Sequence, residues 1–450
     1  MSYPIHRLRE VTLDQFNYVD GELFAEGVSA GELVERYGSP LYVYSSSTLT
    51  SHYQAMADAF AQIDPLICFS IKSCSNLSIL KLLVEQGSGL DVVSGGELQR
   101  ALMAGARPEK IVFAGVGKSL EEIHYAIKAG VFLFNVESES ELLRLDSVAV
   151  ALKRRVKAAI RVNPDVSDAN TPAKTSTGGR QTKFGIPIDR SPELFQPRRY
   201  QAVDVVGVHM HLGSPIPSAS TYLAAIDRLE WLVDELDRTG CTVEFVNIGG
   251  GFPAVYGTET EAYPPIAETG ALLCDRLKAL KARGMAFIIE PGRSISANGG
   301  ILLTRVEYVK QGWDRSITVV DAGMNVLLRP TLYGASHVIW PAASPGFSGH
   351  WSALSSLDRS LFPRVDIVGP ICETGDYLAL DRPLPLPDEH DVLAVFSCGA
   401  YAMSMASQYN SRGRPAEVLV TGKNVQLIRK RESYDDLVAH EMCGLNLPVA

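Results

Sequence analysis

Eight short apolar runs, each followed by a longer segment with helical spacing, constrain the fold of this chain more than any other feature. The runs are ICFSIK (67–72), LDVVS (90–94), IVFAG (111–115), LFNVES (133–138), AAIRVNP (158–164), VVGVHMHLG (205–213), FVNIGGG (245–251) and AFIIEPG (286–292). Strands that alternate with helices build parallel sheets. Eight such units, each with its own helix, predict an α/β fold with a closed (β/α)₈ barrel of the TIM type.

The segments between the runs carry helix signals. Residues 76–86, 95–104, 119–129 and 137–148 place Leu, Ile or Ala at helical spacing. Asn76 and Ser119 are candidate N-caps, and Glu122 follows Ser119 by three positions, which is the capping-box pattern. We therefore expect helices to begin directly after Asn76 and Ser119.

The alternation stops near residue 299. Strand-like runs continue without long helices: ILLTRVEYVK, SITVVDAG, VDIVGP, DVLAVFSCG, AEVLVTG and VQLIRKRE. They predict a second, mostly antiparallel β domain, which the early runs FAEG and YVYS can join. We therefore expect residues 1–45 to join the β domain, residues 46–298 to form the barrel, and residues 299–450 to form the rest of the β domain.

Composition excludes several classes of protein. Of the 450 residues, 46% are hydrophobic and 21% are charged, which is typical of a globular protein and not of a disordered or coiled-coil chain. The formal net charge of −9 argues against a nucleic-acid or anionic-membrane partner. Seven cysteines without a C-x-x-C pair, and no apolar run of signal-peptide or membrane-span type, predict a cytoplasmic location.

Polar residues gather where the predicted barrel strands end, and active sites of such barrels lie at this end. They are Lys72, Asp91, Arg161, His209, His211, Ser214, Gly249, Gly250, Gly251, Glu290, Gly292 and Arg293. The Gly-rich run 249–251 lets backbone N–H groups approach a phosphate, and an ensuing helix would add its positive end. Ser214 and Arg293 can donate to the same anion. A phosphate site beside an amine, Lys72, points to pyridoxal phosphate bound as a Schiff base.

Two further residues fit this cofactor. A carboxylate at Glu290 would keep the pyridine nitrogen protonated and favour decarboxylation, and His211 would stack on the ring. The structural alternatives are an ion-paired or capping carboxylate and a hydrogen-bonded core histidine. The pair His209 and His211 also suggests a metal site, but no other histidine lies at a predicted strand end, so we expect no metal.

Loop 164–182, after the fifth strand, is rich in Thr, Ser, Gly and Pro. It follows the strand on the side where the active site is expected, so it can serve as a lid. A loop that is merely flexible explains the same composition. Both interpretations stay open.

Ordered motifs along nearly the whole chain carry a family resemblance. They are SIKSCSN, LDVVSGGEL, IVFAGVGKS, FNVES, RVNPDV, STGGRQTKFGI, HMHLGS, IGGGF, EPGRSI, VDAGMNVLLRPTLY, VGPICETGD and GAYAMSMASQYNSRGRPAEV. In these motifs the chain resembles the fold-type III decarboxylases that use pyridoxal phosphate, and within them the branch that acts on diaminopimelate. The resemblance implies that Lys72 forms the Schiff base, His211 stacks on the ring and Glu290 pairs with the pyridine nitrogen.

The resemblance also implies the rest of the site. Tyr401 joins Ser214, Arg293 and the glycines near the phosphate, while Cys372 and Glu373 enter from the partner subunit of a homodimer. Arg293, Arg329 and Tyr333 match positions that hold the distal carboxylate of the substrate, with Glu373 on its ammonium group and Tyr401 nearby. A guanidinium can grip a carboxylate bidentately and would repel a terminal ammonium. The implied reaction converts meso-diaminopimelate to L-lysine and carbon dioxide, with Cys372 or a nearby group as the proton donor.

Some motifs depart from the family pattern. Ser70-Ile71 and Ser73-Cys74 flank the lysine, and SDANTPAKTSTGG, HLGSPIP and GASHVIWPAAS differ on the substrate side. A related decarboxylase of another carboxylated or basic amino acid therefore stays open. A non-catalytic cofactor-binding homologue is a third interpretation, which the presence of Lys72, Cys372 and Glu373 argues against.

Overall fold

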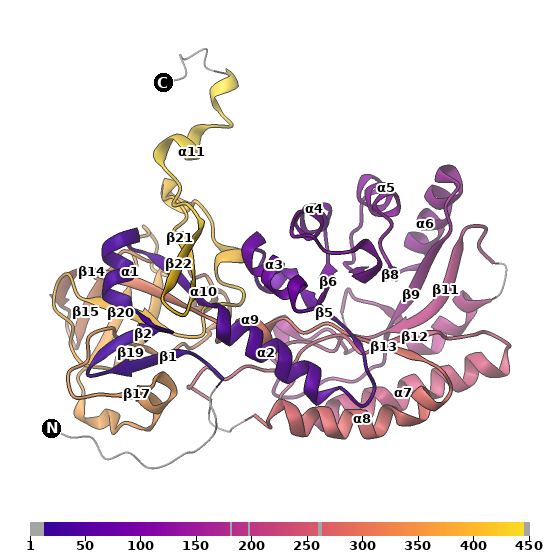
Figure 1. Cartoon of the computed structure of the whole chain (residues 1–450), viewed down its shortest axis with the longest axis horizontal. Helices are drawn as coiled ribbons and strands as arrows, with labels where there is room; N and C mark the ends of the chain where they lie inside the picture. Colours follow the sequence, from indigo (N-terminus) through magenta and orange to yellow (C-terminus); the bar gives the residue numbers. More distant parts are fainter. Residues whose placement is uncertain (1–12, 181, 197–198, 260–262, 445–450) are drawn as a thin grey trace. The chain divides into compact units, whose positions relative to one another are not determined.

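The computed structural model describes residues 13–180, 182–196, 199–259 and 263–444 (Figure 1). These residues divide into two compact units. The β unit groups residues 13–49, 255–259 and 296–444, and the barrel unit groups the remaining described residues from 50 to 295. Within the described chain, no helix is both long and apolar enough to cross a membrane.

Eight parallel strands close the barrel of the barrel unit. They are β5 (Leu66–Ser70), β6 (Gly89–Val92), β7 (Ile111–Phe113), β8 (Leu133–Val136), β9 (Val156–Asn163), β11 (Val203–His209), β12 (Phe245–Asn247) and β13 (Ala286–Ile289). Each strand pairs with the next along the chain, and β13 pairs with β5 to close the ring. All eight predicted strands are confirmed, but each ends earlier than predicted. Lys72, His211 and the glycine run therefore lie in loops just beyond their strands.

The helices of this unit are α2 (Ser46–Ala59), α3 (Leu77–Glu85), α4 (Gly95–Met103), α5 (Leu120–Ala129), α6 (Glu139–Leu152), α7 (Ala219–Arg238), α8 (Ile266–Ala282) and α9 (Arg293–Ser296). Both predicted N-caps are confirmed: the Asn76 side chain accepts from the backbone of Ser78, and Ser119 forms a complete capping box with Glu122. Local side-chain chemistry thus fixes where α3 and α5 begin.

The expectation of one helix after every strand is wrong at two places. Between β9 and β11 the described chain forms only the short strand β10 (Ile186–Pro187) and 3-10 turns, the longest being Ile188–Phe195. Pro192 lies inside this turn, where its missing N–H cannot complete an α-helical ladder. After β13 only α9, four residues long, precedes the β unit.

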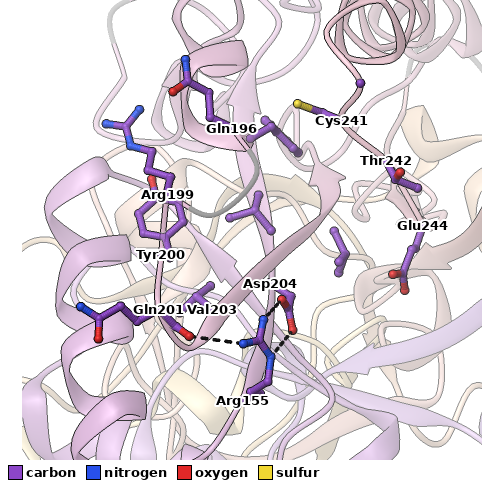
Figure 2. Close-up of a pocket in the computed structure, with 14 residues that line it drawn as sticks. Arg155, Gln196, Arg199, Tyr200, Gln201, Val203, Asp204, Cys241, Thr242 and Glu244 are labelled. Carbon is purple, nitrogen blue, oxygen red and sulfur yellow. Dashed lines mark hydrogen bonds and ion pairs between the residues drawn. The ribbon is translucent and has the colours of Figure 1, made fainter.

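The amino-terminal ends of β9, β11 and β12 border a pocket of about 610 Å³ (Figure 2). Its cations are already paired, because Arg155 binds Asp204 and Arg199 binds Glu139. The pocket's remaining carboxylate, Glu244, binds Lys157 at 2.7 Å. Charges that neutralise one another at this end of the barrel indicate a structural role.

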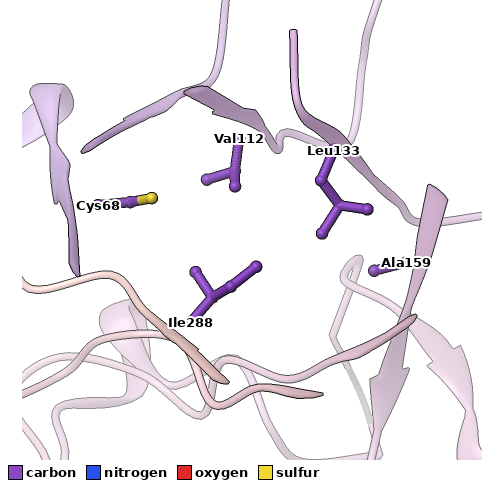
Figure 3. Close-up of a cluster of buried hydrophobic side chains, with 5 residues drawn as sticks. All are labelled: Cys68, Val112, Leu133, Ala159 and Ile288. Carbon is purple, nitrogen blue, oxygen red and sulfur yellow. The ribbon is translucent and has the colours of Figure 1, made fainter. Parts of the chain in front are cut away.

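An apolar layer fills the barrel interior (Figure 3). Cys68, Val112, Leu133, Ala159 and Ile288 come from five different strands, and their side chains point toward one another. Polar residues lie farther along the strands, toward the carboxyl ends. The apolar layer therefore lies on the amino-terminal side of these polar residues.

The β unit contains two sheets. A four-stranded sheet has the order β17 (Gly349–His350), β1 (Phe16–Val19), β2 (Glu22–Ala25) and β3 (Val28–Ser29). The main path of the second sheet is β19 (Tyr377–Pro383), β18 (Arg364–Val368), β15 (Ser316–Val320), β14 (Gly300–Gln311), β4 (Leu41–Ser45), β21 (Ala416–Thr421) and β22 (Asn424–Arg429). Off this path, β20 (Val392–Val395) pairs with β14 and with β16 (Ile339–Pro341). Most pairs are antiparallel, as predicted; β15 with β18 and β4 with β21 are parallel.

Three short helices complete the described part of this unit: α1 (Ala30–Tyr37), α10 (Arg329–Tyr333) and α11 (Tyr434–Val438). The six strands predicted after residue 299 are confirmed, and the early runs FAEG and YVYS overlap β2 and β4. Since β4 pairs with β14 and β21, a segment that precedes the barrel lies in the middle of the second sheet.

Candidate active site

Lys72 lies in a 3-10 turn directly after β5, with its amine beside a buried carboxylate. Its Nζ is 3.2 Å from Oδ2 of Asp91, which is fully buried on the neighbouring strand β6. The Ser70 hydroxyl donates to the same oxygen at 2.7 Å. Burial raises the pKa of Asp91, although the Lys72 ammonium opposes this shift. Asp91 therefore holds the Lys72 amine at the carboxyl end of the barrel. In turn, the positive charge of Lys72 favours the ionised form of Asp91.

Glu290 follows β13 and accepts hydrogen bonds from three strands. The side-chain amides of Asn135 and Asn247 donate to Oε1 at 3.0 and 2.6 Å, and Nε2 of His209 lies 3.3 Å from Oε2. Burial alone would raise the pKa of Glu290, but attraction to His209, the hydrogen bonds and Lys72 hold it below its usual range. The carboxyl group therefore stays ionised although it is buried.

His211 lies two residues beyond β11 and is oriented by backbone. The Gly250 N–H donates to its Nδ1 at 3.1 Å, which leaves the ring proton on Nε2. Burial, followed by the positive charges of Lys72 and Arg161, lowers the pKa of His211 well below its usual value. The ring is therefore neutral, as suits a flat surface for stacking.

Arg161, on β9, is not an unpaired cation. Its Nη1 is 2.8 Å from Oε1 of Glu137, and both side chains are buried. The guanidinium also lies over the Phe184 ring, 4.6 Å from its centroid. Oε2 of Glu137 accepts from the Gly185 N–H at 3.1 Å, so this ion pair also anchors the chain after loop 164–182.

Loop 164–182 is tied to the segment that carries His211. Thr177 Oγ1 donates to the His211 carbonyl at 2.7 Å, and Ser176 forms a β-bridge with Gly213. Within the loop, the Val166 N–H donates to the Gly178 carbonyl at 3.1 Å. These bonds hold the described residues 166–178 of the loop against one another and beside His211, and the action of the loop as a lid stays a prediction.

The glycine run 249–251 packs tightly against neighbouring backbone. A Cβ on Gly250 would lie 2.1 Å from the Glu290 carbonyl oxygen, and one on Gly249 would lie 2.4 Å from that of Met210. Two of the N–H groups are engaged within the protein: Gly249 donates to Asn247, and Gly250 donates to His211. The helix that would add its positive end does not begin next to the run, because α8 begins only at Ile266. The glycines therefore let backbone pack against backbone beneath the site.

Arg293 and Ser214 lie within hydrogen-bond distance of each other, and their binding of a shared anion stays a prediction. Arg293 Nε donates to Ser214 Oγ at 3.0 Å, and Arg293 is buried at the start of α9. Gly292, one residue earlier, packs against Ser70 and Ser73, where an added Cβ would lie about 3.0 Å from the Ser73 hydroxyl. A guanidinium and a hydroxyl thus lie together near the carboxyl ends of β11 and β13.

A cavity of about 570 Å³ opens among these residues. Its lining includes Lys72, Ser94, Gly115, Gly117, Arg161, Thr177, Phe184, His209, His211 and Glu290. Among the described residues, Oδ1 of Asp91, Oδ1 of Asn135 and Nδ1 of His209 are buried without a hydrogen-bond partner. An amine, a fixed carboxylate and a neutral imidazole line one cavity, with unsatisfied polar atoms on His209 in the lining and on Asp91 and Asn135 next to Lys72 and Glu290, and this set fits pyridoxal phosphate.

Five expected site residues belong to the β unit. They are Arg329 and Tyr333 on α10, Cys372 and Glu373 between β18 and β19, and Tyr401 after β20. Arg329 is buried, whereas Cys372 and Glu373 are exposed. The Cys372 N–H donates to the Asn410 side chain at 2.7 Å. A hydrogen bond with Glu373 raises the pKa of Tyr409.

Sequence reasoning missed several partners of these residues. Asn135 and Asn247 hold Glu290, and Glu137 neutralises Arg161. Each is a polar residue in or next to an apolar strand, so the available signal was a polar residue at a position where a buried side chain is expected. In the described ranges, no group of three or more His, Cys, Asp or Glu side chains can hold a metal ion.

Comparison with known proteins identifies the family. Residues 46–297 match the pyridoxal binding domain of the pyridoxal-dependent decarboxylases. A diaminopimelate decarboxylase from Pseudomonas aeruginosa is 44% identical over 432 residues, covering 95% of this chain and 99% of that protein. The diaminopimelate decarboxylase of Aquifex aeolicus is 43% identical over 422 residues, covering 94% of this chain and 96% of that protein.

Solved structures agree with this result. The diaminopimelate decarboxylase of Helicobacter pylori, complexed with L-lysine, matches with a TM-score of 0.84 and 36% identity, covering 92% of this chain and 100% of that chain. The similarity therefore includes both units. The chain belongs to the diaminopimelate decarboxylase family of pyridoxal-dependent decarboxylases.

Proposed function

We propose that the protein decarboxylates meso-diaminopimelate to L-lysine and carbon dioxide, a step of lysine biosynthesis, with pyridoxal phosphate as its cofactor. Family membership supports this proposal. The observation that carries it is the arrangement in the barrel: the Lys72 amine, paired with Asp91, lines the same cavity as Glu290, which three hydrogen-bond partners hold ionised.

Pyridoxal phosphate, when bound, supplies an electron sink for the pair that remains on carbon after carbon dioxide leaves. Lys72 would hold it covalently through Nζ and be displaced by the substrate amine. Because Glu290 is ionised, its carboxylate would accept a hydrogen bond from the protonated ring nitrogen. His211 would stack on the ring as a neutral imidazole.

The phosphate end would be bound by the remaining barrel residues and by Tyr401. Arg293 and Ser214 already donate within one cluster, so an anion there would meet charge and hydrogen bonds together. The glycines 249–251 would contribute shape, since side chains at these positions would collide with backbone. Asp91 would act by balancing the positive charge of Lys72. Arg161 would act by balancing the negative charge of Glu137.

Substrate selection would rest on the β unit. Arg329 is buried, and among the residues that the structure describes no carboxylate lies within ion-pair distance of its guanidinium. Buried charges are normally paired, so a site of this kind favours an anionic ligand. With Tyr333 and Arg293, Arg329 would bind the distal carboxylate of the substrate, and Glu373 would bind the distal ammonium group.

We also propose a homodimer with shared sites and a cytoplasmic location. Cys372 and Glu373 are exposed and adjacent, as suits residues that serve the active site of a partner subunit. Cys372 would donate the proton that replaces carbon dioxide. None of the seven cysteines, all of which lie among the described residues, forms a disulfide bond, which suits a reducing compartment.

The test is carbon dioxide release by the protein loaded with pyridoxal phosphate. Meso-diaminopimelate is supplied alongside L-ornithine, L-lysine and L-arginine, and L-lysine formation is followed by chromatography. Release from meso-diaminopimelate alone, with one L-lysine formed per carbon dioxide, is the expected result. Preference for another amine would assign the protein to a different substrate. Binding of cofactor without any turnover would favour a non-catalytic homologue.

A further inference from the structure

His337 holds the buried guanidinium of Arg329 from one side. Nη1 of Arg329 and Nε2 of His337 are 2.9 Å apart, and both side chains are buried. The other ring nitrogen, Nδ1, lies 2.8 Å from the carbonyl oxygen of Phe396. His337 thus connects the start of α10 to the end of β20.

The chemistry of the two partners fixes the state of this ring. A guanidinium can only donate, so Nε2 of His337 must accept from Arg329. The Phe396 carbonyl can only accept, so Nδ1 must carry the proton. His337 is therefore a neutral imidazole in a single tautomer.

An aromatic ring fixes the flat face of the same guanidinium. Cζ of Arg329 lies 4.7 Å from the centroid of the Tyr256 ring, within the range of a cation–π contact. The Tyr256 ring meets the His337 ring edge to face, with centroids 5.3 Å apart. Two neutral rings at nearly right angles therefore set both the position and the plane of Arg329.

The surroundings preserve the positive charge. Cys398 Sγ lies 3.8 Å from Nδ1 of His337, but burial raises the pKa of this thiol to about 12, so it stays neutral. A carboxylate in place of His337 would orient Arg329 equally well but would cancel its charge. A neutral acceptor orients the guanidinium and leaves its charge for a ligand.

We propose that His337 is a positioning residue for substrate selection: it aims Arg329 at the distal carboxylate without neutralising it. This inference rests on the proposed function, because it takes Arg329 as the group that binds that carboxylate. His337 would therefore affect how strongly a ligand with this carboxylate binds. It would not affect ligands that lack the carboxylate, nor the covalent attachment of the cofactor to Lys72.

The experiment compares L-lysine, which keeps the distal carboxylate, with cadaverine, which lacks it. Inhibition constants for both, and kcat and KM for meso-diaminopimelate, are measured on the cofactor-loaded protein and three variants. His337→Leu removes the acceptor, and His337→Gln keeps a neutral acceptor. Cys398→Ala is the matched control, because it alters a buried neighbour of His337 without removing the acceptor. The absorbance spectrum of the bound cofactor and the melting temperature report on integrity.

For His337→Leu we expect the inhibition constant of L-lysine and the KM of meso-diaminopimelate to rise roughly tenfold to hundredfold, as for loss of a hydrogen bond to a charged group. Cadaverine inhibition, kcat and the cofactor spectrum should change little. His337→Gln should recover most of the loss, and Cys398→Ala should resemble the unaltered protein.

Two results would overturn the inference in different ways. If the unaltered protein favours L-lysine over cadaverine and His337→Leu favours it equally, His337 does not position Arg329, and the proposed function stands. If the unaltered protein does not distinguish the two ligands, the proposed role of Arg329 fails, and the role of His337 fails with it. Should His337→Leu not fold, His337→Ala takes its place, because it also removes the acceptor, and unchanged discrimination between L-lysine and cadaverine in His337→Ala would contradict the inference.

Discussion

Two cations of the barrel unit and one of the β unit have partners of different kinds. In the barrel, Lys72 pairs with Asp91 and Arg161 pairs with Glu137, so these two cations are balanced by carboxylates of the same chain. In the β unit, neutral rings hold Arg329. Under the proposed function, the two kinds of partner suit two kinds of ligand. A cation with a carboxylate partner suits a cofactor that stays bound, whereas a cation held by neutral rings suits an anionic substrate that binds and dissociates.

Replacing Lys72 with Ala should have the largest effect on the barrel side. Turnover of meso-diaminopimelate should fall by about 10³-fold or more, because no amine remains to hold and release the cofactor. The absorbance band of the covalently attached cofactor should also disappear. Lys110→Ala is a matched control, since the ammonium group of this lysine, before the start of β7, donates to the Gly87 carbonyl at 2.9 Å. Full turnover by Lys72→Ala with cofactor bound would contradict the role of Lys72.

Replacing Glu290 with Gln tests whether the barrel carboxylate must be charged. The amide keeps an acceptor for Asn135 and Asn247 but loses the negative charge, so kcat should fall by roughly 10²–10³-fold. Because the pKa of Glu290 lies below its usual range, kcat of the unaltered protein should show no loss from protonation of Glu290 between pH 6 and about pH 8. An unchanged kcat in Glu290→Gln would show that the charge is not needed.

Replacing Arg329 with Met tests the unbalanced charge of the β unit. KM for meso-diaminopimelate should rise by about 10²-fold, with a smaller change in kcat, because a charged hydrogen-bonding partner of the carboxylate is lost. Arg315→Met provides a control, since Arg315 already pairs with Asp366 and Asp381. Equal KM values for the two variants would remove the contrast between the units.

A smaller effect, on the stability of the fold, is expected from the Glu97 carboxyl group. Burial raises the pKa of Glu97 from its usual 4.5 to about 7, so between these values the folded chain holds a proton that the unfolded chain releases. The free energy of unfolding should therefore fall as the pH rises through this window, by about 1–3 kcal/mol from this group. Denaturant unfolding at pH 5 and pH 8 should show the loss in the unaltered protein and a smaller loss in Glu97→Gln. An equal change in the free energy of unfolding between pH 5 and pH 8 in the two proteins would contradict the raised pKa of Glu97.

Apolar periodicity predicts the framework of the barrel well, because strand spacing and cap chemistry are local properties. All eight strands and the caps at Asn76 and Ser119 are confirmed by the structure. The helix expected directly after the glycine run is wrong, since the run is followed by irregular backbone before α8 in the described chain. Glycine alone does not distinguish a phosphate loop from close backbone packing.

The partners inside the site could not be predicted in the same way. Asn135 lies 155 positions from Glu290 and His337 lies 59 from Phe396, so neither contact has a local signal. A neutral Asn inside an apolar strand, or a neutral His just before one, also fits an ordinary buried residue. Only the three-dimensional arrangement shows that Glu290 is held by three partners and Arg329 by neutral rings.

The central proposal is that each active site takes Lys72 from one subunit and Cys372 and Glu373 from its partner. Its most direct test is a hybrid dimer, purified through two different tags, of a Lys72→Ala subunit and a subunit that carries both Cys372→Ala and Glu373→Ala. Shared sites predict that the hybrid has one intact site of two and about half of the unaltered activity, while both parent dimers are nearly inactive. A hybrid that forms but releases no more carbon dioxide than its parents would contradict the claim.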